Sequence, residues 1–146
     1  GRVTFLDYGC VEPIAPPRLA LARKLHAAAL RGDESAFRET AALILETRGG
    51  EWERLATSYS RLCFEPIFRS PHRITRPYAA SLVSELKALV GGARKLPKGE
   101  FVPLPKGMLF MNRLQFGFYS VLARLDVEVD YRAIEHHFMQ EARILD

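Results

Sequence analysis

Asp7, Tyr8 and Gly9 are the residues whose types and spacing most directly permit chemistry, because they directly follow the β-prone run of residues 3–6. A carboxylate at the end of a strand can reach a metal ion bound to phosphate groups, and the glycine lets the chain turn sharply behind it. The same tripeptide also fits an ordinary strand exit, in which Asp7 accepts a hydrogen bond from its own turn. The three residues by themselves leave both interpretations open.

The histidines do not form a metal-ligand pattern. His136 and His137 are adjacent, and adjacent side chains on a helix point about 100 degrees apart, so the two cannot chelate one ion side by side. His137 and Glu141 share a helix face, a spacing that favours a surface ion pair. His26 and His72 have no ligand-spaced neighbour, and no GxSxG, HExxH or Glu-x-x-His pattern is present.

Two segments rich in basic residues are candidates for phosphate contact. Residues 69–76 hold three arginines and a histidine beside a proline. This segment fits a phosphate or anionic-lipid contact, and it also fits a solvated connector, since no aromatic residue is interleaved. Residues 93–105 predict a loop that is long for a compact domain. The lysines and glycines of that loop lack the GxxxxGK(S/T) order of a phosphate-binding loop.

Length and composition bound the class of protein. A chain of 146 residues with 48% hydrophobic and 26% charged residues predicts one globular domain. The 21 basic and 17 acidic residues give a net charge of +4, which is too mild to indicate a nucleic-acid partner. Cys10 and Cys63 are far apart and form no CxxC pattern, which favours reduced, buried thiols in the cytoplasm. The N-terminal residues do not resemble a secretory signal.

Apart from the strand near Val3, the chain predicts about six helices, separated by glycines and prolines. They are expected from about Pro17 to Leu30, from a capping Asp33 to the pair Gly49 and Gly50, from about Trp52 to Phe64, from Pro77 to Val90, from Lys106 to Leu125, and after a capping Asp130. The last of these helices is expected to turn Tyr131, Ile134, Phe138 and Ala142 inward.

The fifth of these helices, residues 106–125, is the most apolar part of the chain. Its apolar residues cover more than one face, which predicts a central, buried helix. Arg113 lies in the middle of the run, so we expect it to be buried beside a carboxylate or carbonyl partner. The arginines Arg113 and Arg124 also argue against a membrane-spanning helix.

Two stretches resemble one known family. Leu6-Asp7-Tyr8-Gly9-Cys10-Val11 resembles the metal-binding Asp-Phe-Gly motif of the atypical kinase-like UbiB/AarF family of ubiquinone biosynthesis, with Tyr in place of the usual Phe. Residues 104–125 are similar to that family's segment Pro-x-x-x-x-x-x-x-Arg-x-x-x-Gly, here with Pro105, Arg113 and Gly117. In the family this segment is a helix that packs deep in the C-terminal lobe. The resemblance spans nearly the whole chain, and these two stretches are its specific parts.

The resemblance implies a mainly α fold, in which residues 1–146 are one domain: the helical C-terminal lobe of a kinase-like protein, with a short N-terminal β-strand. Asp7 would hold Mg²⁺ across the phosphates of ATP, with Tyr8 and Gly9 beside it. The nucleotide-binding lysine, its glutamate partner, the nucleotide-covering loop and the catalytic loop precede this motif in such kinases, and the chain contains none of them. We therefore expect no catalytic residue in this fragment, and an inactive fragment.

The expected partner is the remainder of the same kinase-like fold, with a prenyl-lipid or membrane surface as a further one. A strand without its sheet also predicts self-association of the fragment. The alternative hypothesis is a free-standing helical interaction or lipid-binding module, whose long apolar helix lines a groove. The two hypotheses differ in whether a lysine-bearing strand and an Asp-x-x-x-x-Asn loop are encoded ahead of Val3.

Overall fold

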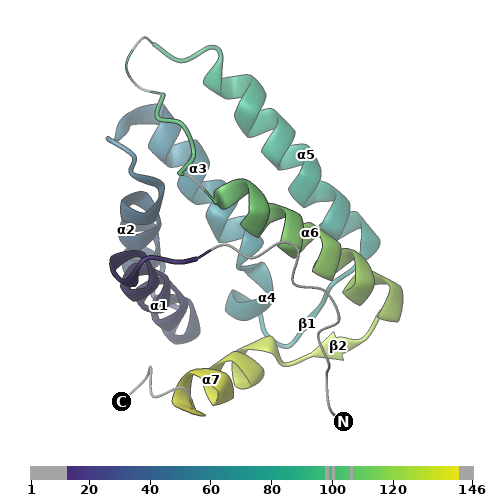
Figure 1. Cartoon of the computed structure of the whole chain (residues 1–146). Coiled ribbons are helices and arrows are strands. Elements are labelled where there is room, and N and C mark those ends of the chain that lie inside the picture. Colours follow the sequence, from purple (N-terminus) through teal and green to yellow (C-terminus); the bar gives the residue numbers. More distant parts are fainter. Residues whose placement is uncertain (1–12, 98, 100, 106, 142–146) are drawn as a thin grey trace.

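The computed structural model of the chain describes residues 13–97, 99, 101–105 and 107–141, and these residues are mainly helical (Figure 1). The elements in chain order are α1 (Pro16–Arg31), α2 (Glu34–Leu45), α3 (Gly50–Cys63), α4 (Glu65–Phe68), β1 (His72–Arg73), α5 (Arg76–Ala93), α6 (Met108–Leu125), β2 (Glu128–Val129) and α7 (Tyr131–Glu141). The mainly α class expected from the sequence is confirmed. The expected strand near Val3 lies outside the described residues.

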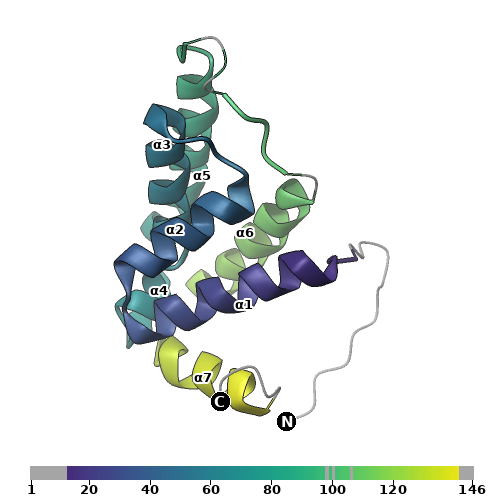
Figure 2. The same cartoon turned by 90° about the vertical axis from the view of Figure 1, so that its left-hand side faces the viewer.

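Helices α1 and α2 form a hairpin along one side of the molecule (Figure 2). Gly32 ends α1 in the left-handed conformation with φ of 70°, and the Asp33 carboxylate then accepts a hydrogen bond of 3.0 Å from the backbone N–H of Ala36. The buried residues of the pair form one cluster: Leu25, Ala28, Ala29, Phe37 and Ala41. This confirms the capping Asp33 that the sequence predicts.

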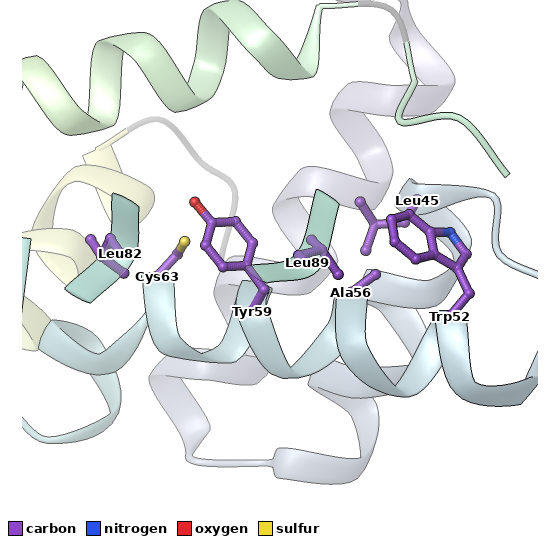
Figure 3. Packing of buried hydrophobic residues seen from close by; sticks show 7 residues of the cluster. All are labelled: Leu45, Trp52, Ala56, Tyr59, Cys63, Leu82 and Leu89. Carbon is purple, nitrogen blue, oxygen red and sulfur yellow. The ribbon is translucent and has the colours of Figure 1, made fainter. Parts of the chain in front are cut away.

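Helix α3 is the centre of the larger core. Its buried residues Trp52, Ala56, Tyr59 and Cys63 recur every three or four positions, so they form one stripe along the helix (Figure 3). Leu45 of α2 and the α5 residues Leu82 and Leu89 complete this cluster, which we call the α3 core. The prediction that Pro66 ends the third helix near Phe64 is confirmed, because Phe64 caps α3 and Pro66 lies in the short helix α4.

The prediction that the helix at residues 106–125 is the most buried one is wrong. Six large apolar side chains of α6 are between 49% and 64% exposed and lie on one face. This face, the α6 stripe, consists of Phe110, Met111, Leu114, Phe118, Val121 and Leu125. Arg113 is exposed rather than buried. The inward face of α6 instead carries the polar residues Asn112, Gln115 and Tyr119. None of the helices in the described part of the chain is long and apolar enough to cross a bilayer.

The inward face predicted for the last helix is wrong for two of its residues, although Tyr131 is half-buried. Ile134 and Phe138 of α7 are exposed, and Met139 is its buried residue. The reason is that α7 docks through Arg132 and Glu135 as well as through Met139, so its contact face is partly polar. Ala142, also expected inward, lies outside the described residues.

Helix boundaries near glycines differ from the prediction in two places. Helix α2 ends at Leu45 rather than at the glycine pair, because Glu46 takes up the left-handed conformation with φ of 55°. Helix α5 continues through Gly91 and Gly92 to Ala93. A glycine within a helix costs about 1 kcal/mol relative to Ala, which the burial of Leu82 and Leu89 in the same helix can offset.

A small antiparallel pair of strands joins the two halves of the chain. In β1 and β2, His72 pairs with Val129, and Arg73 pairs with Glu128. The sequence does not predict these strands, since two residues are too few for a periodic pattern. His72 places its ring edge-on to Tyr78, with 5.3 Å between the ring centroids.

The buried Nε2 atom of the half-buried His72 predicts a pH dependence of stability. Its Nε2 atom is buried and has no hydrogen-bond partner among the described residues. Burial lowers the pKa of His72 and Arg69 lowers it further, while Glu65 and Glu128 oppose this shift. The unfolded chain then binds more protons below pH 6.5, the ordinary pKa of the side chain. We expect the free energy of unfolding to fall as the pH drops below that value.

The measurement is the urea midpoint between about pH 7.5 and about pH 5, compared with His72→Gln. Because carboxylates also titrate in this range, the difference between the two proteins is the informative quantity. We expect His72→Gln to lose less stability on acidification than the parent chain. His137→Gln is the matched control, since His137 is exposed in a surface pair with Glu141. Equal pH dependence of His72→Gln and the parent would contradict the prediction.

Candidate functional site

The residues predicted to bind magnesium and nucleotide are not described by the structure. Asp7, Tyr8 and Gly9, like Cys10, lie in the N-terminal segment outside the described residues. Their assignment stays a prediction. Within the described ranges, no cluster of three or more His, Cys, Asp or Glu side chains could hold a metal ion.

In the basic segment at residues 69–76, Arg69 and Arg73 contact acidic residues of the chain. The Arg69 Nε atom lies 2.8 Å from a carboxylate oxygen of Glu65. Arg73 donates a hydrogen bond of 3.0 Å to the backbone carbonyl of Asp126, and its guanidinium lies 3.6 Å from the Asp126 carboxylate. His137 and Glu141 likewise form the surface pair that their spacing predicts, at 3.3 Å. These contacts favour a connector over a phosphate site at residues 69–76.

A cavity of about 340 Å³ between α1, α2, α3 and α6 is the best candidate for a functional site in the described part of the chain. Its volume lies in the range of small-molecule sites. Most of its wall is apolar and comes from Leu25, Ala41, Ile44, Leu45, Met108 and Met111. We call this the central cavity. A second cavity, of about 540 Å³, lies beside Trp52 and Phe101, and its lining offers few polar groups.

Side-chain amides and hydroxyls line the central cavity on the sides of α3 and α6. Gln115 and Tyr119 each donate to the backbone carbonyl of Cys63, at 3.2 and 3.1 Å, and so satisfy the free carbonyl at the end of α3. Asn112 is only 7% exposed, and its amide has no hydrogen-bond partner among the described residues. The Tyr59 hydroxyl also lacks an oxygen or nitrogen partner there, and it is almost fully shielded from solvent.

A histidine and a carboxylate meet at the rim of the central cavity. His26 of α1 and Glu135 of α7 form a close contact between Nδ1 and Oε1, which joins two helices far apart in the sequence. The His26 ring also packs edge-on against Phe64, with 4.9 Å between the ring centroids. Among the described residues, no lysine or arginine lines the cavity.

Burial keeps the thiol and phenol groups of the central cavity neutral at ordinary pH. Burial raises the pKa of the Cys63 thiol to about 11 and that of Tyr119 to about 12. Burial also raises the pKa of Tyr59 well above its ordinary value, and the neighbouring Cys63 adds to this shift. A thiolate or phenolate nucleophile is therefore disfavoured. The cavity is suited to binding through neutral hydrogen bonds rather than to nucleophilic catalysis.

One residue of this site, Asn112, stands out in the sequence, although the sequence analysis does not identify it as a site residue. Asn112 interrupts an apolar run between Met111 and Leu114, and a polar residue in such a run often faces a functional cavity or a buried partner. The position of the cavity itself depends on how α1, α3 and α6 are arranged in three dimensions.

Comparison of the chain with protein-family models, with curated protein sequences and with solved structures finds no match in any of the three.

Proposed function

We propose that this chain is the helical C-terminal lobe of an atypical kinase or ATPase of the UbiB/AarF type, linked to prenyl-quinone metabolism. In the longer protein, Asp7 would hold Mg²⁺ on ATP, with Tyr8 and Gly9 forming the turn beside it. The observation that carries this proposal is the pair of matching segments in one chain: residues 6–11, and the segment with Pro105, Arg113 and Gly117. The mainly helical architecture between and around these segments supports it.

The exposed face of α6 gives a second line of support. The α6 stripe is a continuous apolar surface, and surfaces of this kind usually mark contact with another protein element. Arg113 and Gly117, two of the three residues that carry the resemblance, are exposed beside it. A side chain at Gly117 would meet no atom within 4 Å in this chain, so packing among the described residues does not explain a glycine there. We propose that the remainder of the kinase-like fold covers this face.

Residues 1–146 alone are not expected to catalyse phosphoryl transfer. Phosphoryl transfer requires several groups that position the phosphates and stabilise their charge, and a single metal ligand provides one of these. The chain lacks the nucleotide-binding lysine and the catalytic-loop Asp and Asn of such kinases. We therefore expect no ATP turnover by residues 1–146.

The test of this proposal is Asp7→Asn in the longer protein that supplies the rest of the fold. Asn keeps the size of the side chain but removes the charge that holds the ion. With nucleotide at about 100 times its Kd, binding stabilises the native state by about 2.7 kcal/mol. We expect the variant to lose this Mg²⁺-ATP-dependent rise in Tm, while its Tm without nucleotide stays near that of the parent.

Asp33→Asn is the matched control for the charge change. Asp33 caps α2, and Asn caps helices about equally well, so both the Tm and its response to Mg²⁺-ATP should be kept. If Asp7→Asn responds to Mg²⁺-ATP as the parent does, Asp7 is only a turn residue and the kinase-like assignment fails.

The alternative function is a free-standing helical interaction or lipid-binding module. The observation that favours it is again the α6 stripe, which Arg113 and Arg124 flank on one side. Apolar helix faces beside basic residues also occur at protein and membrane-surface contacts. This alternative predicts no Mg²⁺-ATP response in either the parent or Asp7→Asn, so the same measurement separates the two functions.

A further inference from the structure

The wall of the central cavity contains an amide that forms no hydrogen bond with another described residue. Asn112 is on the inward face of α6, and its side chain could donate two hydrogen bonds and accept two more. Among the described residues it makes none, although the residue is more than nine-tenths buried. The amide atoms of Asn112 are not among the fully shielded polar atoms without a partner, and Asn112 lines the cavity, so a hydrogen-bonding group of a ligand can pair with them there.

Gln115 extends the same polar surface by one turn of α6. Its Nε2 atom donates to the Cys63 carbonyl, which leaves its own carbonyl oxygen available as an acceptor in the cavity wall. Asn112 and Gln115 are three residues apart and therefore lie on the same helix face. The Tyr59 hydroxyl is directed toward α6 in Figure 3 but is almost fully shielded from solvent, whereas the two amides lie next to each other in the α6 wall of the cavity.

The charges around the cavity restrict what can bind there. Among the described lining residues, His26 is the one histidine and Glu135 the one carboxylate, and they contact each other. No lysine or arginine is among the described lining residues, so no permanently cationic side chain offsets the Glu135 carboxylate. An anionic head group would therefore meet the Glu135 carboxylate without a compensating cation.

We propose that the central cavity binds a neutral, mainly apolar small molecule that carries an amide-type group, with Asn112 pairing to the C=O and N–H of that group. The apolar body of the molecule packs along Leu25, Ile44 and Met108. This site is separate from the nucleotide chemistry proposed for Asp7, and the inference holds whether or not Asp7 binds magnesium.

Three probes of nearly equal shape test the proposal: hydrocinnamamide, the anion hydrocinnamate and the hydrocarbon isopentylbenzene. Binding to the chain is measured by NMR titration of the backbone amides at about pH 8, where carboxylates are ionised. We expect hydrocinnamamide to bind about tenfold tighter than either of the other probes, as one well-placed hydrogen-bonding group provides. Because the hydrocarbon is the more hydrophobic probe, a preference for the amide must come from polar contacts.

Asn112→Leu removes the amide at nearly constant volume. We expect it to weaken hydrocinnamamide binding about tenfold and to leave isopentylbenzene binding equal or tighter. Gln140→Leu is the matched control, because it makes the same kind of change at an exposed position of α7 and should alter no affinity. Ala22→Phe fills the cavity from α1 and should exclude all three probes. It tests whether the probes bind in the central cavity if Asn112→Leu does not fold.

Three results would overturn the proposal. One is the absence of saturable hydrocinnamamide binding to the parent chain. Another is equal affinity for hydrocinnamamide and isopentylbenzene. The third is unchanged hydrocinnamamide affinity in folded Asn112→Leu or Ala22→Phe.

Discussion

Trp52→Ala is expected to lower the free energy of unfolding by about 3–5 kcal/mol, the usual cost of truncating a large buried aromatic side chain. Trp52 is only 2% exposed and belongs to the α3 core. Its ring also packs edge-on against Phe101, with 5.1 Å between the centroids. Since small domains are stable by about 5–15 kcal/mol, this one change would remove a large part of the total. Urea denaturation followed by circular dichroism measures it.

Phe118→Ala is the matched control, because it also truncates an aromatic residue within a helix. Phe118 lies in the α6 stripe and is 64% exposed, so we expect a change within about 0.5 kcal/mol. The comparison decides which helix is central to the chain. If Phe118→Ala costs as much as Trp52→Ala, the core is organised around α6 and the burial described for α3 is wrong.

Local signals in the sequence predict the first half of the fold well. Gly32 and Asp33 mark the end of α1 and the start of α2 because each acts on its nearest backbone neighbours. The inward face of α3 follows from a period of three to four residues, which a single helix displays by itself. Such features depend on contacts of short sequence separation, so the sequence contains enough information to place them.

The sequence prediction fails where burial depends on partners far away in the chain. In α6, apolar residues on more than one face predict a central helix, but α3 and α5 cover only the face with Phe116 and Tyr119. The α6 stripe stays exposed because no described element packs on it. Hydrophobicity shows that a face can be buried, and it does not show which element buries it.

The candidate sites likewise include one that the sequence predicts and one that it does not. The Asp7 motif is visible in the sequence because its residues are contiguous, whereas the central cavity requires α1, α3 and α6 to converge. Asn112 is noticeable in the sequence only as an amide in an apolar run. Its place in the wall of the central cavity becomes evident once the neighbouring helices are placed.

The contact between α4 and α7 depends on Arg132, and Arg132→Ala is expected to cost about 2–3 kcal/mol. The Arg132 Nε atom donates to the Ile67 carbonyl at 3.2 Å, and Nη2 donates to the Phe68 carbonyl at 2.7 Å. These carbonyls lie at the end of α4, where no further turn of helix satisfies them, and the guanidinium also complements the negative end of the helix dipole. Removal of the side chain leaves two partly buried acceptors without their charged donor.

Arg132→Lys and Arg69→Ala complete this experiment. Lysine provides a point charge rather than a planar fork of donors, so we expect it to restore only part of the lost stability. Arg69 is 76% exposed and pairs with Glu65, and its removal should cost no more than about 0.5 kcal/mol. Chemical denaturation of the three variants measures these differences. If Arg132→Ala costs no more than Arg69→Ala, Arg132 does not hold α7 on α4, and the C-terminal helix must be fixed by Met139 and by the contact between His26 and Glu135.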